Sequence, residues 1–268
     1  MDMEALLLGI VNANLAKKAV ASSQAEREDR SMPESTRRPF ESRMRADAAV
    51  ARMAAQNMED AKVMVNVAQT GVTAIKSQLQ AIQEILTDCA HTDGLSAEHL
   101  SGASASVAEH IDEILRLAGD TAFNGMSLLD GQNSVVQIQA GNSVRKQQFA
   151  NLLDSSLSTV LDPNSSNMNL NRLSTELAFN DQAGAQTALN KIGDYIARMQ
   201  NLEAQYAYDY KSLGNMSILF DEQADILDNA QKSTSRTTNT AAAPESDSDY
   251  LQQILASLGN ASIISNAT

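Results

Sequence analysis

Apolar residues recur every three or four positions along the stretch from Ala51 to Leu86. They are Ala51, Ala54, Met58, Ala61, Val65, Ala68, Val72, Ile75, Leu79, Ile82 and Leu86. This alternation, sustained for about five heptads, is typical of the seam of a left-handed coiled coil. Because a single helix cannot bury such a seam by itself, the pattern predicts a partner helix.

A second stretch with the same spacing begins at Ala185, with Glu203 and Ser217 as its two polar exceptions. Its apolar positions are Leu189, Ile192, Ile196, Met199, Tyr206, Tyr210, Leu213, Phe220, Ala224 and Leu227. The chain between the two stretches reverses direction, so we predict that they pair antiparallel. The residues assigned to this seam are Val65, Ala68, Val72, Ile75, Leu79, Ile82, Ile192, Ile196, Met199 and Leu213.

The boundaries of the first long helix and of a shorter second helix follow from polar residues and glycine. The long helix is expected to open near residues 40–44 and to end at about Asp88, before a polar turn with Gly94. Ser96 is a candidate N-cap for the second helix, which is expected to run to about Gly119. Its apolar stripe consists of Val107, Ile111, Ile114 and Ala118.

A β-hairpin is expected after the second helix. Residues 136–140 alternate apolar side chains with glutamines, and residues 144–149 return after a turn. This pattern predicts one small hairpin at about 134–150. Residues 120–131 are expected to be a loop because two glycines interrupt them, and residues 150–182 have no clear pattern.

The two ends of the chain are predicted to be short amphipathic helices joined to the long helices by linkers. Residues 3–28 have an apolar face, and two prolines break the helix within residues 29–39. A Thr-rich break at residues 233–248 precedes a helix at residues 250–264. The apolar residues expected to drive assembly are Leu6, Leu7, Ile10, Val11, Leu15, Leu251, Ile254, Leu255 and Leu258.

Together these elements predict a mainly α fold, a long antiparallel helical coiled-coil rod with one small β-hairpin and terminal amphipathic helices. The helical rod domain is expected to span residues 41–232, and residues 1–40 and 233–268 are expected to form a second part. If the long helices pair antiparallel, both terminal helices lie at the same end of the rod. Their apolar faces then indicate segments that order on assembly, with solvated or mutually paired termini as open alternatives.

Composition narrows the classes of function. The net charge of −13 argues against a nucleic-acid binder or a binder of acidic membranes, because phosphate would repel such a chain. The single cysteine, Cys89, rules out an intramolecular disulfide framework and is interpreted as a buried structural thiol. The acidic start and the lack of a run of ~18 apolar residues predict a chain that is cytoplasmic or exported without a cleaved signal, with no membrane span.

Residues with catalytic chemistry do not form a recognisable site, so no catalytic, cofactor-binding or metal-binding residue is predicted. His91, His99 and His110 lack ligand or triad spacing and are interpreted as surface histidines. The sequence has no phosphate-binding loop, nucleophile elbow or cysteine pair. Tyr206 and Tyr210 are expected to pack in the seam, whereas Tyr208 points elsewhere and is a candidate subunit contact.

Several motifs in the middle of the chain resemble bacterial flagellins. The run from Thr121 to Gly125, which includes Phe123 and Asn124, is similar to the family's Thr-Gln-Phe-Asn-Gly turn, and Leu128 to Gly131 resembles the Leu-Asp-Gly-like turn that follows it. Residues 113–117 and 61–74 are similar to the family's Glu-Ile-Asp-Arg-Val and Ala-Gln-Thr segments. The likeness covers residues 56–150, and by pattern alone residues 185–232. It departs from the family at residues 62–64, which replace Asn-Asp-Gly, and residues 1–45 are hardly recognisable.

This resemblance implies a structural protein that polymerises into the extracellular bacterial flagellar filament for motility, without catalysis or cofactors. It implies that the chain itself is the main partner in a helical homopolymer, together with the flagellar export apparatus and an export chaperone. Residues 150–182 are too short for the large outer domain that many flagellins carry there. Two alternatives stay open, a hook–filament junction protein and a soluble coiled-coil signalling or adaptor protein.

Overall fold

The computed structural model of the chain describes residues 34–92, 94–157 and 167–236. These residues belong to two compact units. One unit is Asn57–Asn215, and the other contains the described residues on either side of it, 34–56 and 216–236. Two long helices, α2 (Glu34–His91) and α5 (Gln182–Arg236), contribute to both units.

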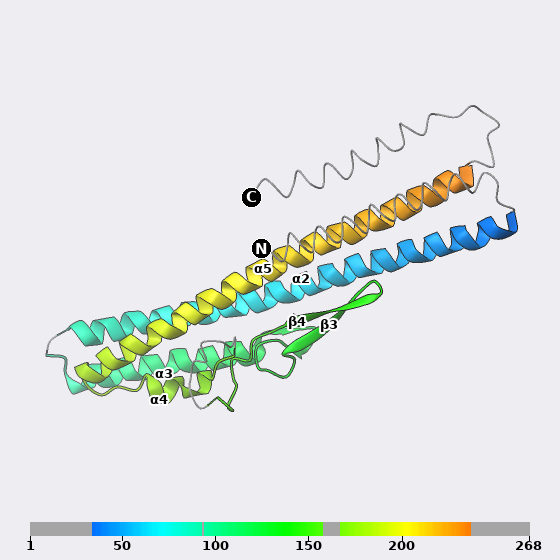
Figure 1. Cartoon of the computed structure of the whole chain (residues 1–268). Helices are drawn as coiled ribbons and strands as arrows, with labels where there is room; N and C mark the ends of the chain where they lie inside the picture. Colours follow the sequence, from blue (N-terminus) through cyan, green and yellow to red (C-terminus); the bar gives the residue numbers. More distant parts are fainter. Residues whose placement is uncertain (1–33, 93, 158–166, 237–268) are drawn as a thin grey trace. The chain divides into compact units, whose positions relative to one another are not determined.

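In the unit Asn57–Asn215, α2 and α5 run antiparallel and lie side by side (Figure 1). Gln182, the first residue of α5, donates a hydrogen bond from Nε2 to the carbonyl oxygen of Ala90 near the end of α2, at 2.8 Å. Further along α5, Glu203 forms an ion pair with Lys76. The residue numbers of the contacts fall on one helix as they rise on the other, which is the signature of antiparallel pairing.

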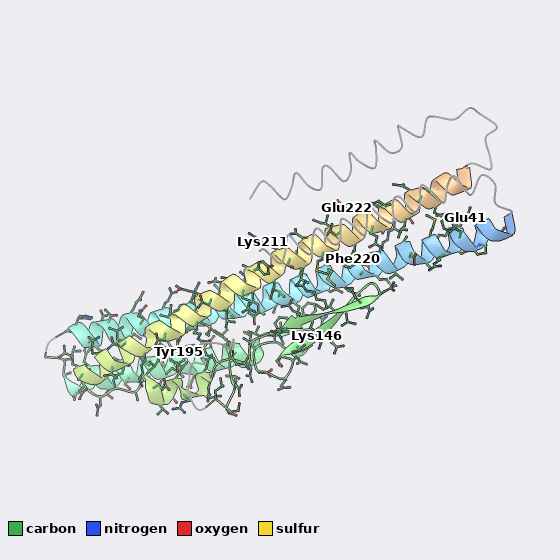
Figure 2. All side chains as sticks on the ribbon, in the orientation of Figure 1. Glu41, Lys146, Tyr195, Lys211, Phe220 and Glu222 are labelled. Carbon is green, nitrogen blue, oxygen red and sulfur yellow. The ribbon has the colours of Figure 1, made fainter. Side chains whose placement is uncertain are left out.

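The apolar ladders of both helices line the core of this unit. The ten residues assigned to the seam are all buried, nine of them with no exposed surface and Ile196 with 8% exposed. They are Val65, Ala68, Val72, Ile75, Leu79, Ile82, Ile192, Ile196, Met199 and Leu213. Larger side chains on α5, Tyr195 (labelled in Figure 2) and Tyr206, are 1% exposed and fill the same core.

The third helix, α3 (Ala97–Asp120), covers part of the core. The side chain of Ser96 accepts a hydrogen bond from the backbone N–H of His99 at 3.2 Å, so Ser96 is the predicted N-cap. The buried residues of α3 are Val107, Ile111, Ile114 and Ala118, the predicted apolar stripe. The turn before α3 contains Gly94, whose positive φ of 72° suits glycine.

Two small antiparallel sheets follow α3. Strands β1 (Ala122–Phe123) and β2 (Met126–Ser127) form the first, within the segment expected to be a loop. Strands β3 (Val135–Ala140) and β4 (Ser143–Gln148) form the second, which is the predicted hairpin. Its inner face buries Ile138, Ala140 and Gln147.

The segment that gave no clear pattern folds into short elements, η1 (Leu170–Arg172) and α4 (Leu173–Glu176). The N–H of Leu170 donates to the Leu152 carbonyl at 2.9 Å, and the N–H of Leu152 donates to the Leu129 carbonyl at 2.8 Å. Leu152, Leu170 and Leu173 have no exposed surface, so this segment extends the core although it lacks a helical or strand period.

The other unit is an antiparallel helix pair with small residues between the helices. The hydroxyl of Ser217 donates to the carbonyl oxygen of Ala55 at 3.2 Å, and Arg52 forms ion pairs with Asp225 and Asp228. The buried small residues are Ala48, Ala51, Ala54, Ala55, Ala224 and Ala230. Alanine lets two helix backbones approach closely but contributes little apolar area.

Two predicted helix boundaries are wrong. Helix α2 begins at Glu34 and contains Pro39, within the segment where the sequence predicts a linker. Proline so close to the start of a helix removes one N–H bond to the first turn, a loss that the rest of this 58-residue helix outweighs. Helix α5 continues to Arg236, past the break expected at residue 233.

The mainly α class with long antiparallel helices and a small hairpin is confirmed, and the β1–β2 hairpin adds to it. The predicted terminal helices at residues 3–28 and 250–264 lie outside the described residues. So do residues 29–33 and 237–248 of the two predicted linkers. Of the described helices, none is long and apolar enough to cross a lipid bilayer.

Candidate functional site

The most distinctive local structure is the tight turn that joins β1 to β2. Asn124 and Gly125 both have positive φ, 50° and 78°. Two successive residues with positive φ are the requirement of a type I′ turn, for which Asn-Gly is the preferred sequence. Phe123 pairs with Met126 across the turn. The three residues of the family-like turn, Phe123, Asn124 and Gly125, therefore form a rigid hairpin tip.

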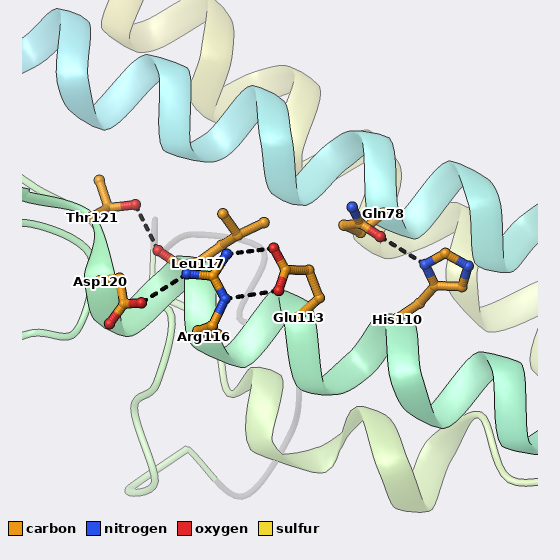
Figure 3. A network of polar contacts seen from close by, with 7 residues as sticks. All are labelled: Gln78, His110, Glu113, Arg116, Leu117, Asp120 and Thr121. Carbon is orange, nitrogen blue, oxygen red and sulfur yellow. Dashed lines mark hydrogen bonds and ion pairs between the residues drawn. The ribbon is translucent and has the colours of Figure 1, made fainter.

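Thr121 links this hairpin to the end of α3. Its hydroxyl donates to the carbonyl oxygen of Leu117 at 2.6 Å (Figure 3). Its own carbonyl oxygen accepts from the N–H of Leu128 at 2.9 Å. The first bond satisfies a carbonyl in the last turn of α3, and the second anchors the strand that follows the turn. The hairpin consequently has a fixed position relative to α3.

Gly71 on α2 makes room for this junction. A Cβ placed at Gly71 would overlap the hydroxyl of Thr121 and lie 2.8 Å from its Cγ2, and it would lie 3.1 Å from Cδ1 of Leu129. Glycine in the middle of a helix costs about 1 kcal/mol relative to alanine. The close approach of α3 and the β1–β2 hairpin to α2 accounts for its presence.

The β3–β4 hairpin contacts both long helices. The side-chain amide of Asn57 on α2 donates to the carbonyl oxygen of Gln139 at 2.9 Å. Gln147, which is 2% exposed, donates from Nε2 to Oδ2 of Asp209 on α5 at 2.8 Å. The hydroxyl of Tyr206 on α5 accepts from the N–H of Ala150 just beyond β4 at 2.9 Å. These bonds tie the hairpin to α2 and α5 at once.

We predict that Tyr206→Phe lowers the free energy of unfolding by about 1–2 kcal/mol, because it leaves the buried N–H of Ala150 without its acceptor. The matched control is Tyr208→Phe, since Tyr208 is 50% exposed and loses the same hydroxyl. Urea unfolding followed by circular dichroism measures both changes. Equal effects of the two substitutions would show that the Ala150 hydrogen bond is not the cause.

The polar exceptions in the seam have partners on α2. Glu203 pairs with Lys76 and accepts from the hydroxyl of Thr73, which also lies 3.0 Å from the carbonyl oxygen of Gln69. The bonds from Lys76 and Thr73 lower the pKa of Glu203. The stabilising contribution of this ion pair is therefore present at neutral pH and is lost as the pH falls through the folded-state pKa of Glu203.

Tyr210, predicted to pack in the seam, lies at its edge instead and is 37% exposed. The ammonium of Lys62 lies 5.3 Å from the centre of its ring, a cation–π arrangement. The side chain of Lys62 also passes Gly214 and pairs with Glu59 at 2.8 Å. Tyr210 thus marks the border of the core. Tyr208 is 50% exposed, and its role as a subunit contact stays a prediction.

The histidines and the cysteine have structural surroundings. His110 is half-buried, and its Nδ1 donates to Oε1 of Gln78 on α2 at 2.7 Å, so the interpretation of this residue as a surface histidine is wrong (Figure 3). His91 bonds the carbonyl oxygen of Thr87 on its own helix. Cys89 is 3% exposed, and burial raises the pKa of its thiol. Among the described residues no group of His, Cys, Asp and Glu side chains is placed to hold a metal ion.

The nine terminal residues predicted to drive assembly all lie outside the described residues. They are Leu6, Leu7, Ile10, Val11, Leu15, Leu251, Ile254, Leu255 and Leu258. The structure therefore places the seam residues and the family-like turn in one unit and leaves the assembly residues as a prediction. The Asn124-Gly125 hairpin lies where a loop is predicted, although Asn-Gly between short apolar segments is a strong hairpin signal.

Comparisons with known proteins found similarity to flagellar proteins. Residues 39–134 match the model of the bacterial flagellin N-terminal helical region. The fold is similar to that of a putative flagellar hook-associated protein from Vibrio parahaemolyticus, with a TM-score of 0.59 and 14% identity over 72% of this chain and 95% of that chain. The crystal structure of Bacillus cereus flagellin matches with a TM-score of 0.45 and 22% identity, over 71% and 95% of the two chains.

No curated protein matches the sequence. The region matched by the family model nevertheless includes most of α2, all of α3 and the Phe123-Asn124-Gly125 turn, the same segments whose motifs resemble flagellin. The similarity of fold to a putative flagellar hook-associated protein covers 72% of this chain, which is more than the region matched by the family model. The chain therefore carries the bacterial flagellin N-terminal helical region at residues 39–134 and resembles flagellins there.

Proposed function

We propose that the chain is a structural subunit that polymerises into the extracellular bacterial flagellar filament. The observation that supports this most is the flagellin N-terminal helical region over residues 39–134, folded here against an antiparallel α5. Long helices with a continuous apolar seam suit a stiff structural element. The flagellin family is structural, which agrees with a role without catalysis.

In the proposed mechanism the two chain ends supply the polymerisation energy. The apolar faces at residues 3–28 and 250–264 are buried against neighbouring subunits, and the seam between α2 and α5 supplies stiffness. Burial of apolar surface stabilises by ~25 cal/mol per Å², so one terminal helix contributes several kcal/mol before its ordering cost is subtracted.

We expect that deletion of residues 248–268 leaves a folded, soluble chain that cannot polymerise. Negative-stain microscopy before and after seeding measures filament formation, and circular dichroism checks that the long helices remain. A second variant replaces Leu251, Leu255 and Leu258 by serine, and a matched control replaces three polar residues of the same segment. Filaments formed by the deletion variant or by the serine variant would contradict the proposal.

Export is part of the same proposal. The subunit is expected to leave the cell through the flagellar secretion channel with the help of an export chaperone. Secretion into the medium that persists after loss of the flagellar export apparatus would contradict this route.

The second candidate is a hook–filament junction protein. It is favoured by the similarity of the fold to that of a putative flagellar hook-associated protein. Copy number separates the two candidates, because a filament subunit is made in thousands of copies per flagellum and a junction protein in a few. Quantitative mass spectrometry of isolated flagella measures this ratio.

A further inference from the structure

The outer face of the β3–β4 hairpin is exposed and partly apolar. The pairing register places Val135 beside Gln148, Gln137 beside Lys146, and Gln139 beside Val144 on that face. All six side chains are exposed, Val135 by 48% and Val144 by 52%. The two exposed valines therefore add apolar area to a face that is otherwise polar.

This face also carries one cation and no anion, on an acidic molecule. The chain has a net charge of −13, yet residues 131–153 contain Arg145 and Lys146 and no aspartate or glutamate. Of these two cations, Lys146 lies on the outer face of the hairpin. Figure 2 labels this residue. A cation flanked by exposed valines selects an acidic surface as its partner.

The outer face of α3 has the opposite character. The charged residues of α3 lie on the side of the helix opposite its buried stripe, and Glu98, Glu109 and Asp112 are exposed there. Arg116 forms ion pairs with Glu113 at 2.6 Å and with Asp120 at 2.9 Å, at the C-terminal end of the helix (Figure 3). The N-terminal part of the face is therefore acidic.

Small residues lie between these carboxylates. Ser101, Gly102 and Ala105 are exposed on the same side of α3, and nothing lies within 4 Å of a Cβ placed at Gly102. The face is thus shallow and open along its middle, with acidic groups at its borders. Such a surface accommodates a ridge of short apolar side chains next to a cation.

We infer that the outer face of the β3–β4 hairpin docks on the acidic face of α3 in a second copy of this chain. Val135 and Val144 lie over the small residues of α3, and Lys146 faces Glu109 and Asp112. This inference rests on the proposed self-assembly, and it adds the surfaces that meet. Exposed ion pairs contribute little affinity, so Lys146 mainly selects the partner surface and its orientation.

The contact is heterologous, because two different surfaces of the chain meet. Each chain presents one hairpin face and one α3 face, and both are exposed within a single copy. A heterologous contact that does not close on itself propagates from copy to copy. The pair of surfaces is therefore suited to a continuous assembly and not to a closed dimer.

The test reverses the charge at the centre of the contact in the full chain. Lys146→Glu should raise the critical concentration for self-association about tenfold or more, since a charge reversal replaces an attraction by a repulsion. Lys191→Glu is the matched control, because Lys191 is an exposed lysine of α5 outside the contact. The double variant Lys146→Glu with Asp112→Lys should recover most of the loss. Sedimentation and light scattering measure the critical concentration.

A second measurement identifies the contact directly. A carbodiimide activates a nearby carboxylate as an O-acylisourea, and the amine of Lys146 attacks its acyl carbon to form an amide while a urea leaves. Mixing chains labelled with ¹⁴N and ¹⁵N separates intermolecular from intramolecular products. We expect intermolecular cross-links from Lys146 to Glu109 or Asp112 in the associated wild-type chain. Equal effects of the two lysine reversals, or association without these cross-links, would overturn the inference.

The outcomes separate this inference from the proposed function. Filaments that form without the Lys146 cross-links overturn the docking surface and leave the filament function in place. Cross-linked oligomers that never elongate into filaments overturn the filament function and leave the docking surface in place. Loss of both cross-links and association at every concentration overturns both.

Discussion

Replacement of Leu79 by alanine should lower the free energy of unfolding by about 2–5 kcal/mol, one of the largest effects expected of any single substitution in this chain. Leu79 is on α2 at the centre of the seam and has no exposed surface. The substitution exposes no polar group but leaves a cavity between α2 and α5. The surrounding side chains are closely packed, so they cannot move in to fill this cavity. Urea unfolding monitored by circular dichroism measures the change.

The control for this prediction is Val63→Ala on the same helix. Val63 is 48% exposed, so its replacement removes little buried area, and alanine has the higher helix propensity. Its free energy of unfolding should remain within about 0.5 kcal/mol of the wild type. A Leu79→Ala loss below about 1 kcal/mol, or an equal loss in Val63→Ala, would mean that the seam does not dominate stability.

Gly71→Val should destabilise the fold by about 3 kcal/mol, because the added carbons have no space. The nearest neighbours, Thr121 and Leu129, are anchored by hydrogen bonds of their own backbone: the N–H of Thr121 bonds the Leu117 carbonyl, and the Leu129 carbonyl accepts from Leu152. Relief therefore requires a shift of α3 and of the β1–β2 hairpin away from α2. Thermal unfolding and near-ultraviolet circular dichroism report the loss of stability and of packing.

Two further variants isolate the steric cause. Gly193→Val on α5 introduces the same side chain where nothing lies within 4 Å of a Cβ, and its effect should be within about 0.5 kcal/mol. Thr121→Ala in the Gly71→Val background removes the overlapping hydroxyl and should recover at least about 1 kcal/mol relative to the sum of the single changes. Additive effects of Gly71→Val and Thr121→Ala would refute the close approach as the cause.

The long helices and their buried residues were predictable because their pattern is repetitive. In α2 each residue from Ala51 to Leu86 on the ladder is buried, and in α3 the four predicted stripe residues are the four that are buried. Apolar residues that recur every three or four positions over this length fit a helix and do not fit the alternating pattern of a strand. Boundaries were less predictable, since Pro39 near the start of α2 is tolerated when a long helix follows it.

The segments outside the long helices were less predictable, because single residues and long-range contacts decide their structure. The β1–β2 hairpin depends on Asn124 and Gly125 alone, and strands of two residues have no period to read. The segment with η1 and α4 takes its form from backbone bonds to Leu129 and Leu152, which no local pattern encodes. Sequence motifs did locate the family-like turn, but not its structure.

The polar positions of the second ladder show a different limit. Heptad spacing assigned Tyr210 to the seam, whereas its ring lies at the border with Lys62 above it. The spacing of apolar residues predicts which side of a helix is buried. Whether a residue on that side lies at the centre or at the edge of the seam depends on the partner helix. Ser217, an exception in the same ladder, is buried because its hydroxyl reaches the Ala55 carbonyl.

The alanine-rich pair in the unit of residues 34–56 and 216–236 has an entropic consequence. Alanine loses no rotamer freedom when it is buried, so Ala48, Ala51 and Ala224 contribute neither a large gain in buried area nor a side-chain entropy cost. The contribution of these alanines to the free energy of pairing is therefore small in either direction. The apolar gain on pairing comes instead from the few larger buried side chains, Met44 and Leu227, to which Arg52 and Ser217 add polar contacts.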